Sequence, residues 1–304
     1  MLFGWSTGGR WLYRDTMYEQ AQYFWVNPNS VRAEISDYPK EDRYLLKVHF
    51  DYLMTEDEAK EKQAAFEQKV QGIVSEAKAA GDTFEQLLYV HDYLCENVVY
   101  DKELYESGEY DTPRITVYGA LMEGKTMCSG YAQAFSLFMR ELGYNAGVEF
   151  NNYGEITLFE GHVWNYVELE GEYYYFDVTW DDTDDEKYSH MYEYFGITTD
   201  ELKQTNYAKR DDAPVPSCNG TRYNYYVYNG CDVPVYSFDA TATAILKQVQ
   251  AGNSIIRLRF GDYGELLRAE SELFTANRIY ELTDVSSCSY GISRLPHLYL
   301  YIYL

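Results

Sequence analysis

The chain has 304 residues, and its 49 Asp and Glu against 25 Lys and Arg give a formal net charge of −24. So acidic a surface repels phosphate backbones and anionic membranes, which argues against nucleic acid as a partner. Hydrophobic residues make up 46% and charged residues 24%. These are the proportions of a soluble globular protein, long enough for one large domain or two ordinary ones.

The sequence contains no signal that commits it to a membrane. No run approaches the roughly 18 apolar residues of a membrane span, so no integral membrane segment is expected. The start, Met1 to Trp5, lacks the basic region and long apolar core of a signal peptide. The localisation stays open: cytoplasmic for the chain as it stands, or secreted or at the cell surface if a signal peptide has been trimmed.

Residues 1–54 are predicted to form a β-rich segment. Aromatic and β-branched runs are broken at residues 27–29 and 37–39, where Asn, Asp and Pro favour turns. This pattern indicates a helical or irregular start followed by strands, one of them over residues 44–52.

Two helices are predicted next. Thr55 begins a capping box, and apolar residues then recur at helical spacing. A second helix opens at residues 82–85, and its apolar face includes His91 and Cys95, one turn apart. This pair could indicate a metal or redox site, but buried packing is the better interpretation because no further ligands lie nearby.

Cys128 is predicted to lie at or just before the beginning of a helix. The spacing of Tyr131, Phe135 and Phe138 marks one apolar helical face, and Gly143 is a natural end. The partial positive charge at a helix N-terminus favours a thiolate over a thiol. A short strand over residues 144–150 should follow.

His162 and Asp177 are predicted to approach each other across a β-hairpin. Residues 162–169 and 172–179 read as two strands joined at residues 170–171, so that paired positions sum to 341. His162 and Asp177 are then diagonal neighbours on one side of the sheet, about 7–8 Å apart at the backbone. Trp164 would share that face and could shield the pair from water, or simply pack in the core.

Together Cys128, His162 and Asp177 have the chemistry of a catalytic triad. A thiol nucleophile needs a base to ionise it and a carboxylate to orient that base. Each residue alone has an ordinary structural explanation: a small buried Cys, a core His, or an Asp that caps a turn. Their order and register together favour the catalytic interpretation.

The acidic run at residues 181–186 could be a calcium loop, but it lacks the sixth-position Gly and the distal Glu of an EF-hand, so a solvated loop is favoured.

Residues 213–216 are a plausible linker. The C-terminal region from 210 to 304 should be α+β. Its expected elements are a Tyr-rich hairpin (223–228 with 233–238), a helix from about 241, a strand at 254–260, a helix near 265–274 and a last strand at 298–304.

The five cysteines are an odd number without a dense framework, so at least one must be free in a monomer. Cys218 and Cys231 could pair if they flank a hairpin. The sequence does not decide this pairing.

Three motifs in register resemble the transglutaminase-like superfamily, in its bacterial, papain-like cysteine protease branch. They are Cys-x-Gly-Tyr-Ala at 128–132, Gly-His-x-Trp-Asn at 161–165 and Asp-Val-Thr-Trp-Asp at 177–181. The resemblance covers about residues 84–182, with further likeness at 91–94, 119–121 and, loosely, 218–221.

The resemblance implies an α+β fold, with a papain-like core of helices packed on an antiparallel sheet. The chain would then divide into the N-terminal segment 1–54, a catalytic core 55–209 and a smaller C-terminal region 210–304. Cys128 would be the nucleophile, His162 the base and Asp177 the group that fixes the imidazole. Tyr118 is the candidate for a side-chain oxyanion donor, because larger transglutaminases use an aromatic residue there.

The implied function is thiol-dependent attack on an amide through a thioester, giving hydrolysis or transfer to an amine. The substrate would be a peptide, protein or cell-wall amide, with no cofactor or metal. The alternatives are a catalytically silent surface module that binds peptide or glycan in the same groove, and a cell-wall scaffold. The sequence leaves open the substrate, the acceptor, a need for calcium, the oligomeric state and any autoinhibition of the site.

Overall fold

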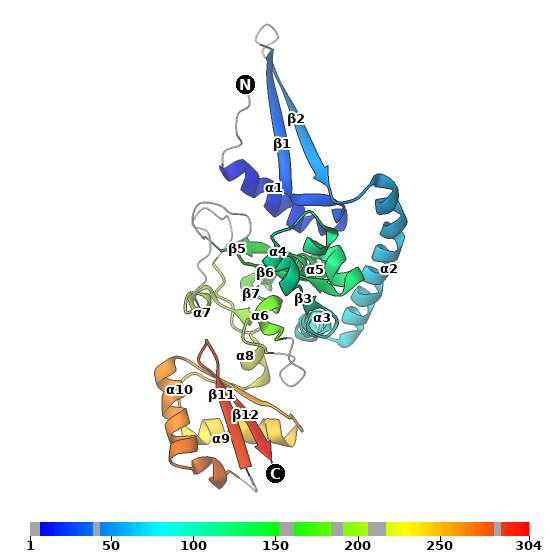
Figure 1. The fold of residues 1–304 in the computed structure, drawn as a ribbon. Coiled ribbons are helices and arrows are strands. Elements are labelled where there is room, and N and C mark those ends of the chain that lie inside the picture. Colours follow the sequence, from blue (N-terminus) through cyan, green and yellow to red (C-terminus); the bar gives the residue numbers. More distant parts are fainter. Residues whose placement is uncertain are drawn as a thin grey trace. The chain divides into compact units, whose positions relative to one another are not determined.

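The structure is a computed structural model that describes residues 7–38, 43–151, 161–183, 191–205, 217–282 and 287–303. It divides into two compact units. Unit 1 comprises residues 1–194 and 208–216, and unit 2 comprises residues 195–207 and 217–304. Figure 1 labels the elements of both units. The three-part division at residues 54 and 209 stays a prediction.

Unit 1 begins with a helix, a long β-ribbon and two further helices. The bounds are α1 (Thr7–Glu19), η1 (Ala21–Tyr23), β1 (Val26–Tyr38), β2 (Arg43–Tyr52), α2 (Glu56–Ala80) and α3 (Thr83–Asn97). Strands β1 and β2 pair antiparallel. Both helix starts agree with the sequence: Thr55 and Asp82 each form a capping box with the Glu three residues later.

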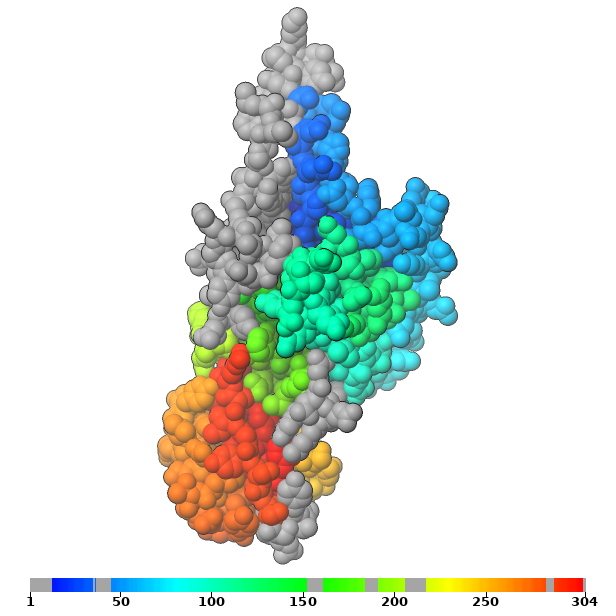
Figure 2. Space-filling view, in the orientation of Figure 1, coloured from blue at the N-terminus to red at the C-terminus, as the bar shows by residue number. Residues whose placement is uncertain are grey.

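Helix α5 (Cys128–Glu141) is the centre of unit 1. Its residues from Ser129 to Met139 are all buried, so the helix is covered on every side rather than amphipathic. The short elements that precede it are β3 (Val99–Tyr100), α4 (Lys102–Ser107), η2 (Pro113–Ile115), η3 (Gly119–Glu123) and β4 (Lys125–Thr126). In Figure 2 the turquoise surface of this middle region abuts the blue surface of the N-terminal elements.

Three consecutive strands of unit 1 pair antiparallel with their neighbours: β5 (Asn145–Phe150), β6 (Val163–Leu169) and β7 (Glu172–Phe176). Leu169 faces Glu172, and the ladder continues with the expected sum of 341 as far as Asn165 opposite Phe176. Glu170 and Gly171 both have positive φ, 54° and 85°, which fits a tight two-residue hairpin turn. The predicted register is therefore confirmed.

The predicted length of the second strand is wrong. Strand β7 ends at Phe176, and Thr179 lies in the short helix α6 (Val178–Asp181) instead of facing His162. Asp177 caps this helix, because its carboxylate accepts the backbone N–H of Trp180. Asp177 was expected within a strand, but it lies between the end of β7 and the start of α6.

Unit 2 packs helices against a second sheet, of order β11-β12-β10-β9. Its elements are β8 (Phe195–Ile197), α7 (Thr199–Leu202), α8 (Tyr225–Asn229), β9 (Asp232–Val233), α9 (Phe238–Gln250), β10 (Ile256–Phe260), α10 (Tyr263–Glu270), η4 (Ser271–Thr275), η5 (Arg278–Glu281), β11 (Ser287–Ile292) and β12 (His297–Tyr303). The strands and helices expected after residue 238 are present, with small shifts in their ends.

The Tyr-rich hairpin of unit 2 is a wrong prediction. Its first arm is the helix α8, and β9 pairs in parallel with β10 rather than with a neighbouring arm. Cys218 and Cys231 are both buried, and neither they nor the other three cysteines form a disulfide in the structure. The condition for their pairing, a hairpin between them, is therefore absent from the structure.

Both units place helices on sheets that are wholly or mainly antiparallel, so the α+β fold class is confirmed. Within the described ranges, no helix combines the length and apolar character needed to cross a bilayer. Residues 213–216, proposed as a linker, and residues 184–186 of the acidic run lie outside the described residues.

Asn165 joins three elements of unit 1, because its side-chain amide donates to the carbonyls of Ala132 in α5 and Gly147 in β5 at 2.9 and 3.2 Å. We expect Asn165→Ala to lower the free energy of unfolding by about 1–3 kcal/mol, since it leaves two buried carbonyls without this donor. Urea unfolding of unit 1 measures the loss. Asn145→Ala is the control: its exposed amide bonds Glu168 at 2.7 Å in the same sheet, and should cost less than about 0.5 kcal/mol. Equal losses in the two variants would contradict the role of Asn165.

Candidate active site

Cys128 is the first residue of α5, after the N-cap Met127. The first N–H groups of a helix have no acceptor within the helix, so those of Cys128 and Ser129 are available at this end. Gly130 permits the geometry: a Cβ there would lie 2.0 Å from the Thr126 Oγ1 atom. The glycine of the nucleophile motif therefore allows the start of α5 to pack on β4.

His162 and Asp177 are in direct contact. The His162 Nε2 atom lies 2.5 Å from Asp177 Oδ2, while the other carboxylate oxygen caps α6 through Trp180 at 3.2 Å. The backbone of His162 is held by Asn151, whose Oδ1 accepts the His162 N–H at 2.7 Å. The residues predicted to be neighbours from the hairpin register are thus brought together.

The His162 imidazole is stabilised in its protonated form. Burial acts against the charge, but the charge and hydrogen bond of Asp177, together with the nearby Cys128, raise its pKa to about 10. The side chain of His162 is 11% exposed and that of Asp177 4%. The structure therefore brings all three predicted triad residues together, in the order thiol, imidazole, carboxylate.

Two tryptophans enclose the imidazole. The Trp164 ring is stacked with it at a centroid distance of 6.0 Å, and the Trp180 ring meets it edge-on at 5.9 Å. Trp164 is buried and lies on the same face of the sheet as His162, as the alternation of strand residues predicts. Trp180 was missed, because the sequence indicated a strand where α6 turns it toward His162.

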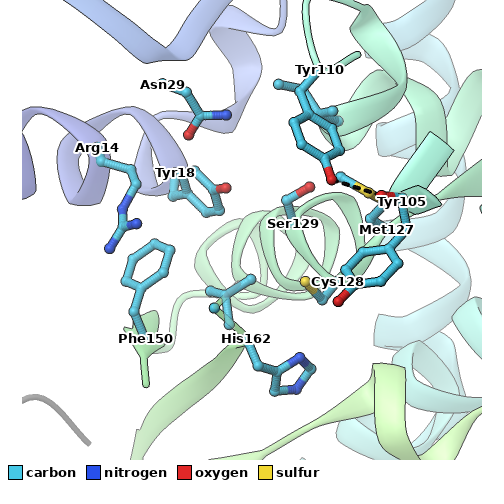
Figure 3. Close-up of a pocket in the computed structure, with 13 residues that line it drawn as sticks. Arg14, Tyr18, Asn29, Tyr105, Tyr110, Met127, Cys128, Ser129, Phe150 and His162 are labelled. Carbon is cyan, nitrogen blue, oxygen red and sulfur yellow. Dashed lines mark hydrogen bonds between the residues drawn. The ribbon is translucent and has the colours of Figure 1, made fainter. Parts of the chain in front are cut away.

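Cys128 and His162 open into a pocket whose other walls come from α1 and β1, from the segment 105–127 that leads into α5, and from the ends of β5 and β6 (Figure 3). Arg14 and Phe150 lie on one side of it, and Tyr105 and Tyr110 on the other. Its lining residues are Arg14, Tyr18, Asn29, Tyr105, Tyr110, Ile115, Met127, Cys128, Ser129, Phe150, Gly161, His162 and Val163.

Helix α1 supplies two of the pocket residues that sequence reasoning missed, Arg14 and Tyr18. Arg14 is buried, with its guanidinium 3.5 Å from the centre of the Phe150 ring. Tyr18 is also buried, and burial raises the pKa of its hydroxyl. No local motif marks α1, so only its apolar and aromatic residues could have indicated contact with the core.

Tyr118, the candidate oxyanion donor, is not among the residues that line this pocket. Its ring stacks on Phe24 at 4.8 Å, and the Lys62 ammonium lies 5.2 Å above it. Its aromatic contacts therefore explain its burial without a role at Cys128. The oxyanion role of Tyr118 stays a prediction that this geometry does not support.

His91 is buried, as the packing interpretation predicts, but it also contacts two carboxylates. Its ring nitrogens lie 2.9 Å from Asp92 Oδ1 and 3.1 Å from Asp181 Oδ2. Asp181 is itself fully buried, which contradicts the solvated loop predicted at that position. Within the described residues, no cluster of three or more His, Cys, Asp or Glu side chains could hold a metal ion.

Comparison with known proteins agrees with the motifs. Residues 67–178 match the model of the transglutaminase-like superfamily, and this segment contains Cys128, His162 and Asp177. No curated protein matches the chain.

Two solved structures are similar to parts of the chain. One is a putative cysteine protease from Cytophaga hutchinsonii, at 17% identity over 36% of this chain and 37% of that one, with a TM-score of 0.28. The other is described as a TGase, at 14% identity over 61% of this chain and 51% of that one, with a TM-score of 0.34. The chain thus spans about a third and about half of the length of these two proteins.

The segment 67–178, which includes the three residues that the fold brings together, is therefore similar to the transglutaminase-like superfamily.

Proposed function

We propose that the protein is a thiol-dependent amide or peptide hydrolase or acyl transferase, in which Cys128, His162 and Asp177 act as a triad. One observation carries this proposal: Cys128 and His162 line the same pocket, and the His162 Nε2 atom lies 2.5 Å from the Asp177 carboxylate. This is the relation of nucleophile, base and orienting group that covalent catalysis needs.

The chemistry follows from the ring's two contacts. Since Nε2 faces Asp177, Nδ1 is the nitrogen that takes the thiol proton. The Cys128 sulfur attacks the carbonyl carbon of an amide, and His162 then gives its proton to the departing amine as the C–N bond breaks. A thioester remains on Cys128. Water or a second amine attacks it, which releases an acid or a new amide and returns the proton to the thiol.

The negative oxygen of the tetrahedral intermediate would be stabilised at the start of α5. The backbone N–H groups of Cys128 and Ser129 belong to the first helical turn, and both residues line the pocket. Such donors are effective because they are fixed before the charge develops. Their pairing with the nucleophile on one helix turn supports acyl chemistry over simple binding.

The substrate would be a peptide, protein or cell-wall amide that reaches Cys128 along the aromatic pocket. Tyr105 and Tyr110 offer flat apolar surfaces on one side, and Arg14 adds a positive charge on the other. The reaction proposed here needs no cofactor, because the thiol, imidazole and backbone donors supply its nucleophile, proton transfer and charge stabilisation.

Trapping of the thioester tests the proposal. The protein would be incubated with a library of glutamine-containing peptides and peptide amides, with and without hydroxylamine, and its Cys128 peptide followed by mass spectrometry. We expect an acyl adduct on Cys128 and, with hydroxylamine, a peptide hydroxamate. Cys128→Ala should give neither product while remaining folded. Peptide bound without any adduct or turnover would favour the silent binding module instead.

We expect Cys128 to react with iodoacetamide faster than Cys288 at pH 6. Both thiols are partly exposed, but only Cys128 shares a pocket with an imidazole, that of His162, whereas burial raises the pKa of Cys288. Peptide mass spectrometry measures the two rates in one sample, so Cys288 is an internal control. Equal rates at pH 6 would mean that His162 does not activate the thiol.

Asp177→Asn should lower kcat by about 10²–10⁴-fold with little change in KM, because the amide cannot stabilise the imidazolium or hold its tautomer. The measurement uses a substrate that the trapping screen identifies. Glu172→Gln is the matched control, since this exposed carboxylate lies at the start of the same strand β7, opposite Leu169 and away from His162. A loss confined to KM would reject the proposed role of Asp177.

The stability of unit 1 should fall between pH 6.5 and 10 through His162. Its folded-state pKa, raised to about 10, exceeds the ordinary value of 6.5, so its contribution is complete below pH 6.5 and is lost as the pH rises through 10. Unfolding free energies of the wild type and His162→Gln should therefore converge with rising pH. A difference that stays constant over this interval would show that His162 is not held as a cation.

A further inference from the structure

A second imidazole–carboxylate contact lies in unit 1, outside the pocket. His91 on α3 is 1% exposed and Asp181, the last residue of α6, is 0% exposed. The His91 ring is covered by Tyr192 at a centroid distance of 5.1 Å, and the Tyr192 hydroxyl lies 3.3 Å from Asp92. Neither His91 nor Asp181 lines the pocket, so this contact has no direct part in the proposed chemistry.

The geometry makes His91 a cation. Both ring nitrogens lie within hydrogen-bond distance of carboxylate oxygens, which accept but do not donate when ionised. Although burial opposes the charge, these bonds raise the pKa of His91. Burial raises the pKa of Asp181, and the hydrogen bond and charge of His91 act against that shift. The contact is thus an ion pair without solvent access.

The ion pair fixes the end of α6. One oxygen of Asp181 faces His91, and the other accepts the backbone N–H of Tyr194 at 3.0 Å. The next residue, Asp182, lies 2.5 Å from the Tyr131 hydroxyl of α5. Helix α6 is thus joined at its C-terminus to α3 by His91 and to α5 by Tyr131.

The other end of α6 carries the triad carboxylate. Asp177 is its N-cap, and the Trp180 ring, one residue before Asp181, meets His162 edge-on. A helix with only four residues has little internal stability, so its position depends on such external contacts. A displacement of Asp181 would therefore move both Asp177 and Trp180.

We propose that His91 is a positioning residue of the active site: by holding Asp181, it sets the place of α6 and hence the contact of Asp177 with His162. A role of His91 in catalysis rests on the proposed function. The dependence of the His162–Asp177 contact on His91 does not, and it can be measured without any enzymatic activity. Without the imidazolium, the Asp181 carboxylate is a buried charge with its main partner removed, which favours rearrangement toward water.

The test follows the titration of His162 by NMR of the imidazole nitrogens in the whole chain, which has five histidines. Asp177→Asn first defines the effect of losing the carboxylate. We expect His91→Gln to lower the midpoint of His162 in the same direction, by at least about one pH unit, a factor of about ten in the protonation equilibrium. In the double variant His91→Gln/Asp177→Asn, the shift should not exceed that of Asp177→Asn alone, because both changes act on one contact.

His297→Gln is the matched control, since His297 is equally buried but belongs to unit 2. It should leave the His162 midpoint unchanged. If His91→Gln does not fold, Asp181→Asn removes the charge while keeping the side chain's shape and its acceptor for Tyr194. A folded His91 or Asp181 variant with an unmoved His162 midpoint overturns the proposal.

Alkylation of Cys128 by iodoacetamide separates this proposal from the proposed function. A reactive Cys128 in the wild type that slows about tenfold or more at pH 6 in His91→Gln supports both. A reactive Cys128 that is unaffected by His91→Gln argues against the positioning role alone. An unreactive wild-type Cys128 argues against the proposed function, and the His162 titration then still decides whether His91 positions Asp177.

Discussion

The carboxylate of Asp177 is the group on which the site depends, because its two oxygens act on different parts of the molecule. One accepts the Trp180 N–H and begins α6, and the other lies 2.5 Å from the His162 ring. The same side chain thus ends a strand, caps a helix and orients the imidazole. Such a capping Asp has little freedom to rotate, because turning it toward or away from His162 would release the helix N-terminus. Local chain geometry therefore fixes the angle of the imidazole's partner.

The hairpin could be predicted from the sequence, but the short helix α6 that follows it could not, for a physical reason. Strand register follows a strict period of two, and the Glu170–Gly171 turn fixes its origin, so pairing could be counted from residues alone. Val178-Thr179-Trp180 has strand-forming residues, yet it is helical because Asp177 and Asp181 have partners far along the chain. The wrong prediction at the Tyr-rich helix α8 has a different cause. Asn224 and Gly230 are residues that typically begin and end a helix, but the tyrosines between them favoured the prediction of a strand.

Contacts over long sequence distances explain what else could not be predicted. Tyr18 packs with Ala132 and Phe150, and Arg140 in α5 bonds the Glu19 carboxylate at 3.0 Å and its backbone carbonyl at 3.1 Å. Neither contact produces a periodic pattern from which it could be predicted. Together they make α1 part of the core of unit 1, so the pocket wall formed by α1 is held by the packing of the unit itself. Proteolytic removal of α1 would expose the apolar surface that it buries. Helix α1 is therefore unlike a propeptide that can be cleaved off without disturbing the core.

The two histidine–aspartate contacts of unit 1 show how the same chemistry takes different roles through exposure. His162 is reached from a pocket that it shares with a thiol, so its proton can be exchanged with a substrate. His91 has carboxylates at both nitrogens and an aromatic ring above it, so its proton has no reacting partner. In a chain with so large an excess of acidic residues, a buried cation between two carboxylates offsets their repulsion where α3 meets α6. His91 is the more deeply buried of the two, but only His162 shares a pocket with a thiol. Access to a nucleophile, rather than burial, therefore marks His162 as the candidate for catalysis.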